Sequence, residues 1–339
     1  MSLSDELFSL SFKDRIPLYT TLEITYRCNL SCIHCYIPKE YRNLRGEITY
    51  QQTRKVIKQI ADVGGLYLVF TGGEPLLRED IFDLIAYAKK LKFVVILFTN
   101  GTLVDSNVAR KIKLSGVDKV EISLYGDREV HNKITKGDWF DKTVNGIGYL
   151  RELGIKVAIK LPIMKPNYKG YKFIRKYVQK NGLEVKFDFV LAPKNDGNKD
   201  PQKYIISCDK IKDLLREYFK GKRFVVDNED IFSNLICSAG RNIVGISAKG
   251  DIYPCLQFPY VMGNIKEKSF YDIWYDKRKI DFVLNQKFED FIDCKGCKLL
   301  VYCSRCPGIS YVETRSFFRC STTAKFVAKV VKEYAKSIS

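Results

Sequence analysis

Cys28-Asn29-Leu30-Ser31-Cys32-Ile33-His34-Cys35 is the most informative segment of this chain. It places three thiols within eight residues, directly after a strand-like run at residues 21–25. Cysteine thiolates are the usual protein ligands of iron–sulfur clusters. If these three cysteines hold a four-iron cluster, one iron keeps no protein ligand, and that iron is free to chelate a small molecule.

A structural zinc ion is the alternative occupant of the same loop. Zinc sites of this kind are closed by four ligands, so His34 or a remote residue would have to complete the set. The residue types by themselves leave both interpretations open.

The spacing C-x3-C-x2-C resembles the signature of the radical S-adenosylmethionine (radical SAM) enzymes. The resemblance implies that Cys28, Cys32 and Cys35 ligate a [4Fe-4S] cluster and that His34 stands in the aromatic position before the last cysteine. In that family the open iron binds S-adenosylmethionine (SAM) and splits it reductively to a 5′-deoxyadenosyl radical, so we expect both cofactors here.

Strand and helix patterns alternate after the cysteine loop. Apolar runs at residues 66–71, 93–99, 119–124, 156–161 and 185–191 are typical of buried parallel strands. Amphipathic segments at residues 48–63, 80–91, 103–115, 143–153 and 171–180 predict the helices between them. With the strand before Cys28 this makes six βα units, too few to close an eight-stranded barrel. We therefore predict an α/β fold with an open, partial (βα)6 TIM-like barrel.

Several polar residues fall at the carboxyl ends of these strands, where parallel α/β folds place their reactive groups. Gly72-Gly73-Glu74-Pro75 resembles the radical SAM "GGE" motif, which implies that it holds the amino group of SAM. Ser123 matches the position of a serine that contacts the SAM ribose or carboxylate, although Tyr125 replaces the more common Asp. Lys160 is a cation in an apolar strand, and we expect it to meet the SAM carboxylate.

Seven more cysteines follow within ninety residues, amid what reads as little regular structure. Two zinc ribbons would explain the Cys-x2-Cys pairs. The array more closely resembles the SPASM extension, which houses two auxiliary iron–sulfur clusters, although two residues rather than three separate Cys303 from Cys306. The resemblance assigns the outer cluster to Cys294, Cys297, Cys303 and Cys320, and the inner cluster to Cys237, Cys255 and Cys306. An open iron, another group or Cys208 would complete the inner set. Bound metal, more than a large hydrophobic core, is expected to supply the folding energy of this region.

The domain boundaries follow from these patterns. We expect an N-terminal extension at residues 1–17, the partial barrel at 18–200, a bridging helical region at 201–235, the SPASM domain at 236–322 and a C-terminal helix at 323–339.

Composition limits the function classes. The 339 residues carry a formal net charge of +18, which favours an acidic partner. Lysines are nevertheless spread in helical registers without a dense basic block, so solvated helix faces explain most of the charge and nucleic acid is not the expected ligand. No apolar run reaches the roughly 20 residues of a membrane span. The chain shows no signal peptide, and eleven cysteines suit a reducing cytoplasm better as metal ligands than as disulfides.

We therefore expect a cytoplasmic radical SAM/SPASM enzyme that abstracts hydrogen from a ribosomally made precursor peptide and so forms a crosslink, an excision or an epimer. The short segment before Cys28 predicts a separate leader-peptide-binding protein or direct peptide recognition, with ferredoxin or flavodoxin as the electron donor. Processing of porphyrin side chains in haem biosynthesis is the alternative substrate class. A zinc-bearing nucleic-acid-binding module and a pure electron-transfer protein are the alternatives outside this enzyme class.

Overall fold

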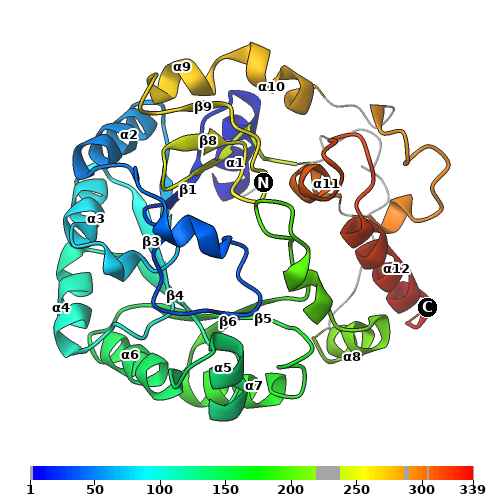
Figure 1. Ribbon diagram of the computed structural model, residues 1–339, viewed down its shortest axis with the longest axis horizontal. Coiled ribbons are helices and arrows are strands. Elements are labelled where there is room, and N and C mark those ends of the chain that lie inside the picture. The colour runs from blue at the N-terminus through cyan, green and yellow to red at the C-terminus, as the bar shows by residue number, and fades with distance from the viewer. Residues whose placement is uncertain (1–2, 219–236, 286–289, 304, 339) are drawn as a thin grey trace.

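One curved sheet of nine strands organises the molecule. The computed structural model describes residues 3–218, 237–285, 290–303 and 305–338. The strands lie in the order β6-β5-β4-β3-β2-β1-β7-β8-β9, parallel from β6 through β7 and antiparallel from β7 to β9. Helices ring the strands on the outside, so the inner face of the sheet encloses the centre of the molecule (Figure 1).

The strands are short, as expected for a barrel-like sheet. Their bounds are β1 Tyr19–Glu23, β2 Tyr67–Thr71, β3 Val94–Thr99, β4 Lys119–Ser123, β5 Val157–Pro162, β6 Glu184–Asp188, β7 Ile243–Ile246, β8 Asp251–Tyr253 and β9 Gly263–Asn264.

The described helices connect and cover these strands. The α-helices are α1 Leu3–Lys13, α2 Tyr50–Asp62, α3 Ile81–Lys90, α4 Ser106–Ser115, α5 Arg128–Thr135, α6 Phe140–Glu152, α7 Tyr171–Asn181, α8 Cys208–Tyr218, α9 Phe270–Trp274, α10 Lys277–Leu284, α11 Pro307–Thr314 and α12 Thr322–Lys336. Short 3-10 turns are η1 Lys39–Asn43, η2 Pro75–Leu77, η3 Asp200–Tyr204 and η5 Leu300–Tyr302.

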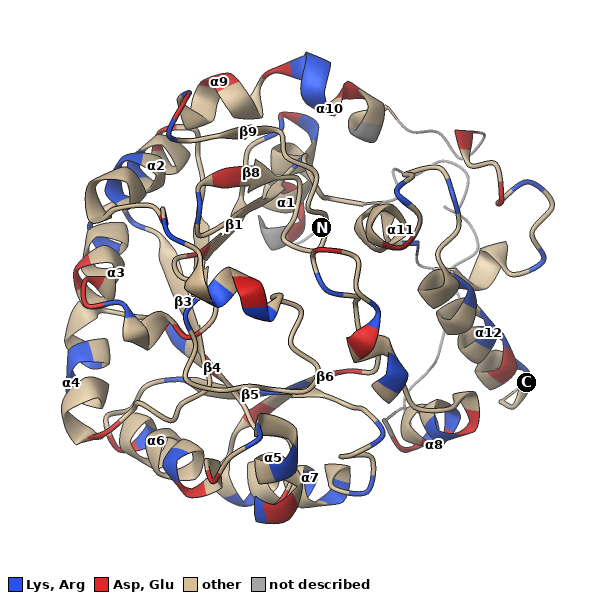
Figure 2. Cartoon of the chain, in the orientation of Figure 1, with Lys and Arg blue, Asp and Glu red and all other residues tan. Residues whose placement is uncertain are grey.

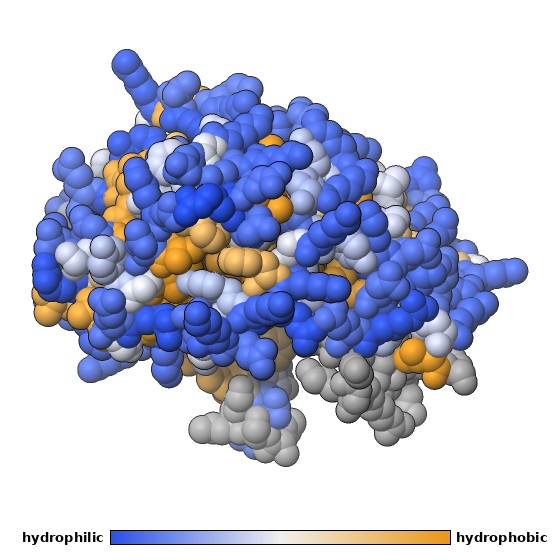
Figure 3. All heavy atoms as spheres, turned by 90° about the horizontal axis from the view of Figure 1, so that it is seen from below, coloured by the Kyte–Doolittle hydropathy of each residue, from blue (hydrophilic) through white to orange (hydrophobic). Residues whose placement is uncertain are grey.

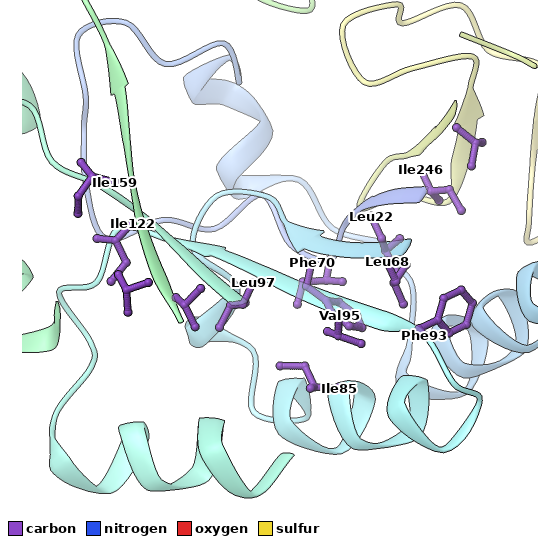
Figure 4. Packing of buried hydrophobic residues seen from close by; sticks show 14 of the residues in the cluster. Leu22, Leu68, Phe70, Ile85, Phe93, Val95, Leu97, Ile122, Ile159 and Ile246 are labelled. Atoms are coloured by element: carbon purple, nitrogen blue, oxygen red, sulfur yellow. The ribbon is translucent and has the colours of Figure 1, made fainter. Parts of the chain in front are cut away.

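The main core lies between the sheet and the outer helices. Alternate residues of each strand point to this side, and Phe70, Val95 and Leu97 of neighbouring strands face Ile85 of α3 (Figure 4). All four side chains are fully buried, and each such burial is worth roughly 1.5–3 kcal/mol. The other set of alternate positions points to the inside of the barrel, and there the strands carry polar residues such as Thr21, Glu23, Thr71, Ser123 and Lys160 (positions fixed by the strand pairing).

The predicted barrel is confirmed. Each of the six predicted strands is present within a few residues of its expected bounds, and so are the helices between them. One connection was not predicted as a helix: α5 occupies the segment after β4, with Asp127 capping its first turn through the Val130 N–H. Its eight residues are too short to show a helical hydrophobic period clearly.

The expectation of little regular structure after residue 236 is wrong. Strand β7 pairs with β1 and continues the parallel sheet, and β8 and β9 extend it further. Ile246, Phe270 and Trp274 join the same hydrophobic core as the barrel, so this part of the chain rests on a shared core. The sheet thus crosses the expected boundary at residue 236, and the domain limits stay predictions. Of the expected bridging region at residues 201–235, residues 219–235 lie outside the described residues.

The charge distribution agrees with solvated helix faces. Lys and Arg occur on nearly all the helices around the ring and are interspersed with Asp and Glu (Figure 2). The face that lies below in the view of Figure 1 is largely hydrophilic where it is not grey (Figure 3). No helix in the described part of the chain combines the length and the apolar composition needed to cross a membrane.

Candidate active site at the carboxyl ends of the strands

The cysteine loop is anchored to α5 and to the end of β3. The backbone N–H groups of Ser31 and Ile33 donate to the last carbonyls of α5, at Thr135 (3.4 Å) and Ile134 (3.1 Å). Asn29, between the first two cysteines, exchanges side-chain hydrogen bonds with residues after β3: its Nδ2 donates to Thr102 Oγ1 (2.8 Å), and its Oδ1 accepts from Asn100 Nδ2 (2.9 Å). These bonds fix the loop before any ligand binds.

Gly72 and Gly73 are required by the close approach of the backbone that leads to Cys28. The Gly73 N–H donates to the Thr25 carbonyl (2.7 Å), and a Cβ on Gly73 would lie 2.1 Å from the Arg27 carbonyl oxygen. A Cβ on Gly72 would lie 2.2 Å from the Thr25 oxygen, and its φ of +138° is itself outside the usual range of other residues. The glycine pair and the cysteine loop are therefore one structural unit, although about forty residues separate them in sequence.

The three cysteines line one cavity, which we call the cysteine cavity. Its volume is about 230 Å³, and strand ends β2 to β5 form its floor. Its lining residues are Tyr26, Cys28, Leu30, Cys32, His34, Cys35, Tyr36, Ile37, Arg42, Thr71, Gly72, Gly73, Phe98, Thr99, Asn100, Glu121, Ser123, Tyr125 and Lys160. The structure thus brings together all three predicted cluster ligands with His34, Gly72, Gly73, Ser123 and Lys160.

The buried thiols of this cavity need a positively charged group beside them to ionise and act as ligands. Burial raises the pKa of Cys32 to about 12, and the neighbouring Cys35 and Cys28 add to the shift. Burial also raises the pKa of Cys28. Because the thiolate is the ligating form, a cationic metal core is the group that would offset this desolvation. In the described part of the chain, no three His, Cys, Asp or Glu side chains form a group that could hold a single metal ion; the three thiols are arranged around a cavity.

Glu74 lies behind the cavity wall. Its carboxylate is completely buried and accepts three hydrogen bonds, from Thr99 Oγ1 (2.7 Å), the Asn100 N–H (2.8 Å) and the Leu76 N–H (3.1 Å). Burial raises its pKa to about 7, against the effect of these donors. Pro75 is buried beside it as the first residue of η2. The side chains of Glu74 and Pro75 do not line the cavity, whereas Gly72 and Gly73 do. Glu74 therefore joins the ends of β2 and β3, and the glycine backbone is the part of this segment that faces a ligand.

Ser123 and Tyr125 bring the end of β4 to the cavity. Tyr125 is 5% exposed, and its ring lies 5.0 Å from that of His34 and 5.5 Å from that of His131. Burial, together with Cys32, raises its pKa well above the ordinary value. The Tyr125 N–H donates to His131 Nδ1 (3.4 Å), and this hydrogen bond ties the end of β4 to α5. Burial lowers the pKa of both histidines to about 4, so they pack here as neutral rings.

Lys160 faces a second cavity as well as the first. Its Nζ lies 3.8 Å from the Glu121 carboxylate and 3.6 Å from the centre of the Phe98 ring, and burial lowers its pKa. The second cavity, which we call the barrel cavity, has a volume of about 270 Å³. It shares His34, Tyr36, Thr71, Phe98 and Lys160 with the cysteine cavity, so the two spaces adjoin.

The barrel cavity reaches the C-terminal cysteines. Its far wall includes Leu256 and Gln257, which follow Cys255, and Ile309 and Val312 on α11, which begins directly after Cys306. Residues 190–193 and Asn195, which follow β6, add a mainly apolar wall. A molecule in this cavity would therefore lie between the cysteine cavity and the Cys255–Cys306 region.

The pKa values of the C-terminal thiols are raised by burial and by neighbouring thiols. The pKa of Cys255 is raised to about 12, and Cys237 and Cys306 add to the shift. The pKa of Cys303 is raised to about 11, and Cys320, Cys294 and Cys297 add to the shift. The assignment of these seven cysteines to two clusters stays a prediction.

Arg305 is 8% exposed, and burial lowers the pKa of its guanidinium. Four of the C-terminal thiols act on this pKa in the opposite direction: Cys294, Cys320, Cys303 and Cys306. The guanidinium lies 3.5 Å from the centre of the Phe291 ring. Its Nε and Nη1 have no hydrogen-bond partner in the described part of the chain. Cys208 lies elsewhere, on α8, where its thiol donates to Glu333 of α12 (3.2 Å).

Sequence reasoning missed three residues of the site. Tyr36 lines both cavities and donates its hydroxyl to the buried Glu23 (2.6 Å). Arg42 donates to the Leu30 carbonyl and, at 4.0 Å, to the Cys35 sulfur. Of these three residues, only Glu23 could have been noticed in the sequence, because a carboxylate in a buried strand is rare without a partner. Arg42 lies in a turn without periodic pattern, and nothing in the sequence marks it.

Comparison with known sequences identifies two domains. The radical SAM superfamily matches residues 22–170, and the SPASM iron-sulfur cluster-binding domain matches residues 237–307. The chain is 26% identical over 323 residues to the AdoMet-dependent heme synthase of Nitratidesulfovibrio vulgaris, covering 85% of this chain and 87% of that protein. It is 27% identical over 313 residues to the antilisterial bacteriocin subtilosin biosynthesis protein AlbA of Bacillus subtilis, covering 86% of this chain and 67% of that protein.

Solved structures with the same fold include SuiB of Streptococcus suis bound to the precursor peptide SuiA. Its TM-score is 0.74 at 18% identity, over 95% of this chain and 80% of that one. The structure of anSMEcpe with bound AdoMet and the Cp18Cys peptide has a TM-score of 0.70 at 20% identity, over 94% of this chain and 97% of that one. The two family matches therefore show that the chain carries a radical SAM domain at residues 22–170 and a SPASM iron–sulfur cluster-binding domain at residues 237–307, and the solved structures show that it shares their fold.

Proposed function

We propose that this enzyme modifies a ribosomally made peptide, one of whose side chains enters the barrel cavity. A radical SAM domain implies a [4Fe-4S] cluster and SAM, and a SPASM domain implies auxiliary iron–sulfur clusters. Cys28, Cys32 and Cys35 would hold this cluster, and when bound it would supply the one-electron chemistry for reductive cleavage of SAM and hydrogen abstraction from a substrate. The observation that carries the proposal is the pair of adjoining cavities, one bordered by the three N-terminal cysteines and the other by the chain around Cys255 and Cys306.

The residues of the cysteine cavity have distinct proposed roles. Cys28, Cys32 and Cys35 ligate the cluster, because they are the thiols that line this cavity. The backbone of Gly72 and Gly73 receives the ammonium end of SAM, since no side chain stands between it and the cavity. These roles agree with the lining of the cavity, which offers three thiols and the main chain of two glycines.

Three further side chains complete the proposed SAM site. Ser123 contributes a hydroxyl, and the ammonium of Lys160 attracts a carboxylate from either cavity. Glu74 acts as a positioning residue that holds the end of β3 through the Thr99 and Asn100 donors.

The auxiliary cysteines are proposed to hold two clusters. Cys294, Cys297, Cys303 and Cys320 form a complete four-thiol set, and Cys237, Cys255 and Cys306 form a set of three. Cys208 does not complete the inner set in this conformation, because its thiol is bonded to Glu333 on α12. We propose that the fourth position of the inner cluster stays open to a substrate group in the barrel cavity.

The size and lining of the barrel cavity favour a side chain over a macrocycle. Pockets that enclose whole drug-sized ligands measure roughly 300–1,000 Å³, and this one measures about 270 Å³. Its walls combine apolar side chains of residues 190–193, Leu256 and α11 with polar ones, which are Thr21, His34, Tyr36, Thr71, Lys160, Asn195 and Gln257. The SuiB structure, in which the same fold is bound to the precursor peptide SuiA, supports a peptide substrate.

Porphyrin side-chain processing is the second candidate. Two observations favour it: curated relatives are heme synthases, and Lys160 would pair with a propionate as readily as with a peptide carboxylate. Under this alternative the macrocycle would stay outside, with only its side chain in the barrel cavity.

A single set of anaerobic assays tests the proposal. Reconstituted enzyme, SAM and dithionite should yield 5′-deoxyadenosine. Adding a peptide encoded beside the gene should raise this yield, and mass spectrometry should show that the mass of the peptide has changed by one modification. Coproporphyrin or another tetrapyrrole is the competing substrate, and its conversion in place of the peptide would refute the peptide proposal. Colourless protein that contains only zinc would refute the whole assignment.

The cellular partners follow from this chemistry. We propose a cytoplasmic location, a ferredoxin or flavodoxin as electron donor, and either a separate leader-binding protein or direct recognition of the peptide.

A further inference from the structure

A third, smaller cavity lies behind the cysteine loop, and its lining is strongly basic. Its volume is about 120 Å³, and we call it the basic bay. Cys32 and Cys35 form its inner wall. Five cations border it, Lys39, Arg42, Lys136, Lys194 and Lys203, and Asp200 is the one acidic residue among the described residues that line it.

The positive charge of the basic bay is only partly neutralised. Asp200 lies 3.5 Å from Lys194 and 3.8 Å from Lys203. Lys39 and Lys136 are exposed and make no ion pair in the described part of the chain. A concave surface with an excess of one charge raises the local concentration and association rate of partners of opposite charge.

The cysteine loop separates the basic bay from the substrate side. Cys32 and Cys35 line both the bay and the cysteine cavity, whereas Ser31 and Ile33 line the bay alone and His34 does not line it. The bay shares no lining residue with the barrel cavity. It is therefore a second approach to the same sulfur atoms, from the side opposite to the substrate.

Arg42 fixes the inner wall of this bay. It donates to the Leu30 carbonyl and to Ser31 Oγ (3.5 Å), and its other terminal nitrogen lies 4.0 Å from the Cys35 sulfur. Its guanidinium is thus committed to the loop, and the exposed lysines remain for an outside partner.

We propose that the basic bay is the docking surface of an acidic one-electron carrier protein. The inference rests on the proposed function, because it assumes that Cys32 and Cys35 hold the iron–sulfur group. The carrier loses one electron and is oxidised, and the iron–sulfur group gains that electron through its sulfur ligands; no proton or atom is transferred. An acidic leader peptide would also suit the charge, but it has to deliver its reacting side chain to the barrel cavity, which the bay does not adjoin.

Charge reversal at the two unpaired lysines tests this assignment. The variant K39E/K136E changes the net charge by four, and K55E/K113E on the outer faces of α2 and α4 is the matched control, since Lys55 and Lys113 are also exposed. Reduced ferredoxin is the protein donor, and dithionite is the small donor that needs no docking surface. For each variant we would measure 5′-deoxyadenosine formation against donor concentration, the affinity for ferredoxin by titration, and the iron content.

The bay variant should lose at least tenfold in kcat/KM and affinity for ferredoxin at low ionic strength, within the range of electrostatic steering. Its iron content and dithionite-driven rate should stay within about threefold of wild type, as should every property of the control pair. Added salt should weaken ferredoxin binding to the wild type and much less to the bay variant.

Unchanged ferredoxin affinity in K39E/K136E would overturn the inference, and so would a loss confined to binding of the peptide. A wild type that forms no 5′-deoxyadenosine with dithionite would instead refute the proposed function, and the ferredoxin titration would still decide the docking surface.

Discussion

Replacing Glu23 by Gln should make the enzyme less sensitive to alkaline pH. Glu23 lies on the inner face of β1 and is 0% exposed. Its Oε1 accepts the hydroxyl of Tyr36 at 2.6 Å, while Oε2 has no hydrogen-bond partner in the described part of the chain. Burial raises the pKa of this carboxyl from 4.5 to about 7, against the smaller opposite effect of Tyr36. Gln keeps the shape and the Tyr36 bond but carries no charge.

The sign and size follow from linkage. Because the pKa in the folded state lies above that in the unfolded state, the folded protein binds the extra proton. The stability that it contributes is present in full below pH 4.5 and is lost as pH rises through about 7. Between the two pKa values, 4.5 and about 7, each pH unit lowers the free energy of unfolding by about 1.4 kcal/mol. From pH 6 to pH 8.5 only about one pH unit lies below the folded-state pKa. Over that range the wild type should therefore lose about 1.4 kcal/mol more than E23Q.

Urea unfolding of both proteins at the two pH values measures this difference, and the other titrating groups cancel in the comparison. Tyr36→Phe serves as the control, because loss of its hydrogen bond raises the pKa of Glu23 further and moves the transition to higher pH. An identical pH dependence in the wild type and E23Q would show that Glu23 is ionised throughout, and the argument from burial would then be wrong.

Three further outcomes test the site. Gly73→Ala should reduce both iron incorporation and SAM cleavage at least tenfold, because the new Cβ would lie 2.1 Å from the Arg27 carbonyl oxygen; normal iron content with normal turnover would contradict the role of this turn. Cys28→Ser should remove about four irons per chain and abolish 5′-deoxyadenosine while the auxiliary cluster signals persist, as followed by iron assay and electron paramagnetic resonance. Arg305→Gln should make the reduction potentials of the auxiliary clusters more negative, because a buried positive charge beside both thiol groups favours the reduced state; a redox titration with unshifted midpoints would exclude this.

The sequence alone determined the chemistry and the barrel. Three closely spaced cysteines, a glycine pair after the next strand and the alternation of apolar runs with amphipathic segments are local signals, and short-range physics is enough to interpret them. The grouping of the C-terminal thiols was also predictable, because the family resemblance gives the pairing of positions. The pKa of Cys255 is raised in part by Cys237 and Cys306, and that of Cys303 by Cys320, Cys294 and Cys297, which agrees with this grouping without testing it.

Tertiary structure alone decided what surrounds those cysteines. Strand β7 joins β1 across more than two hundred residues, and this pairing extends the barrel and brings Cys255 toward the cavities. The inward position of Lys160, the Glu23–Tyr36 bond and the basic bay likewise combine side chains from separate elements. Such contacts depend on which strands pair and how the sheet curves, and no local pattern in the chain encodes them. Only the folded molecule shows that the cysteine loop faces the cysteine cavity on one side and a positively charged surface on the other.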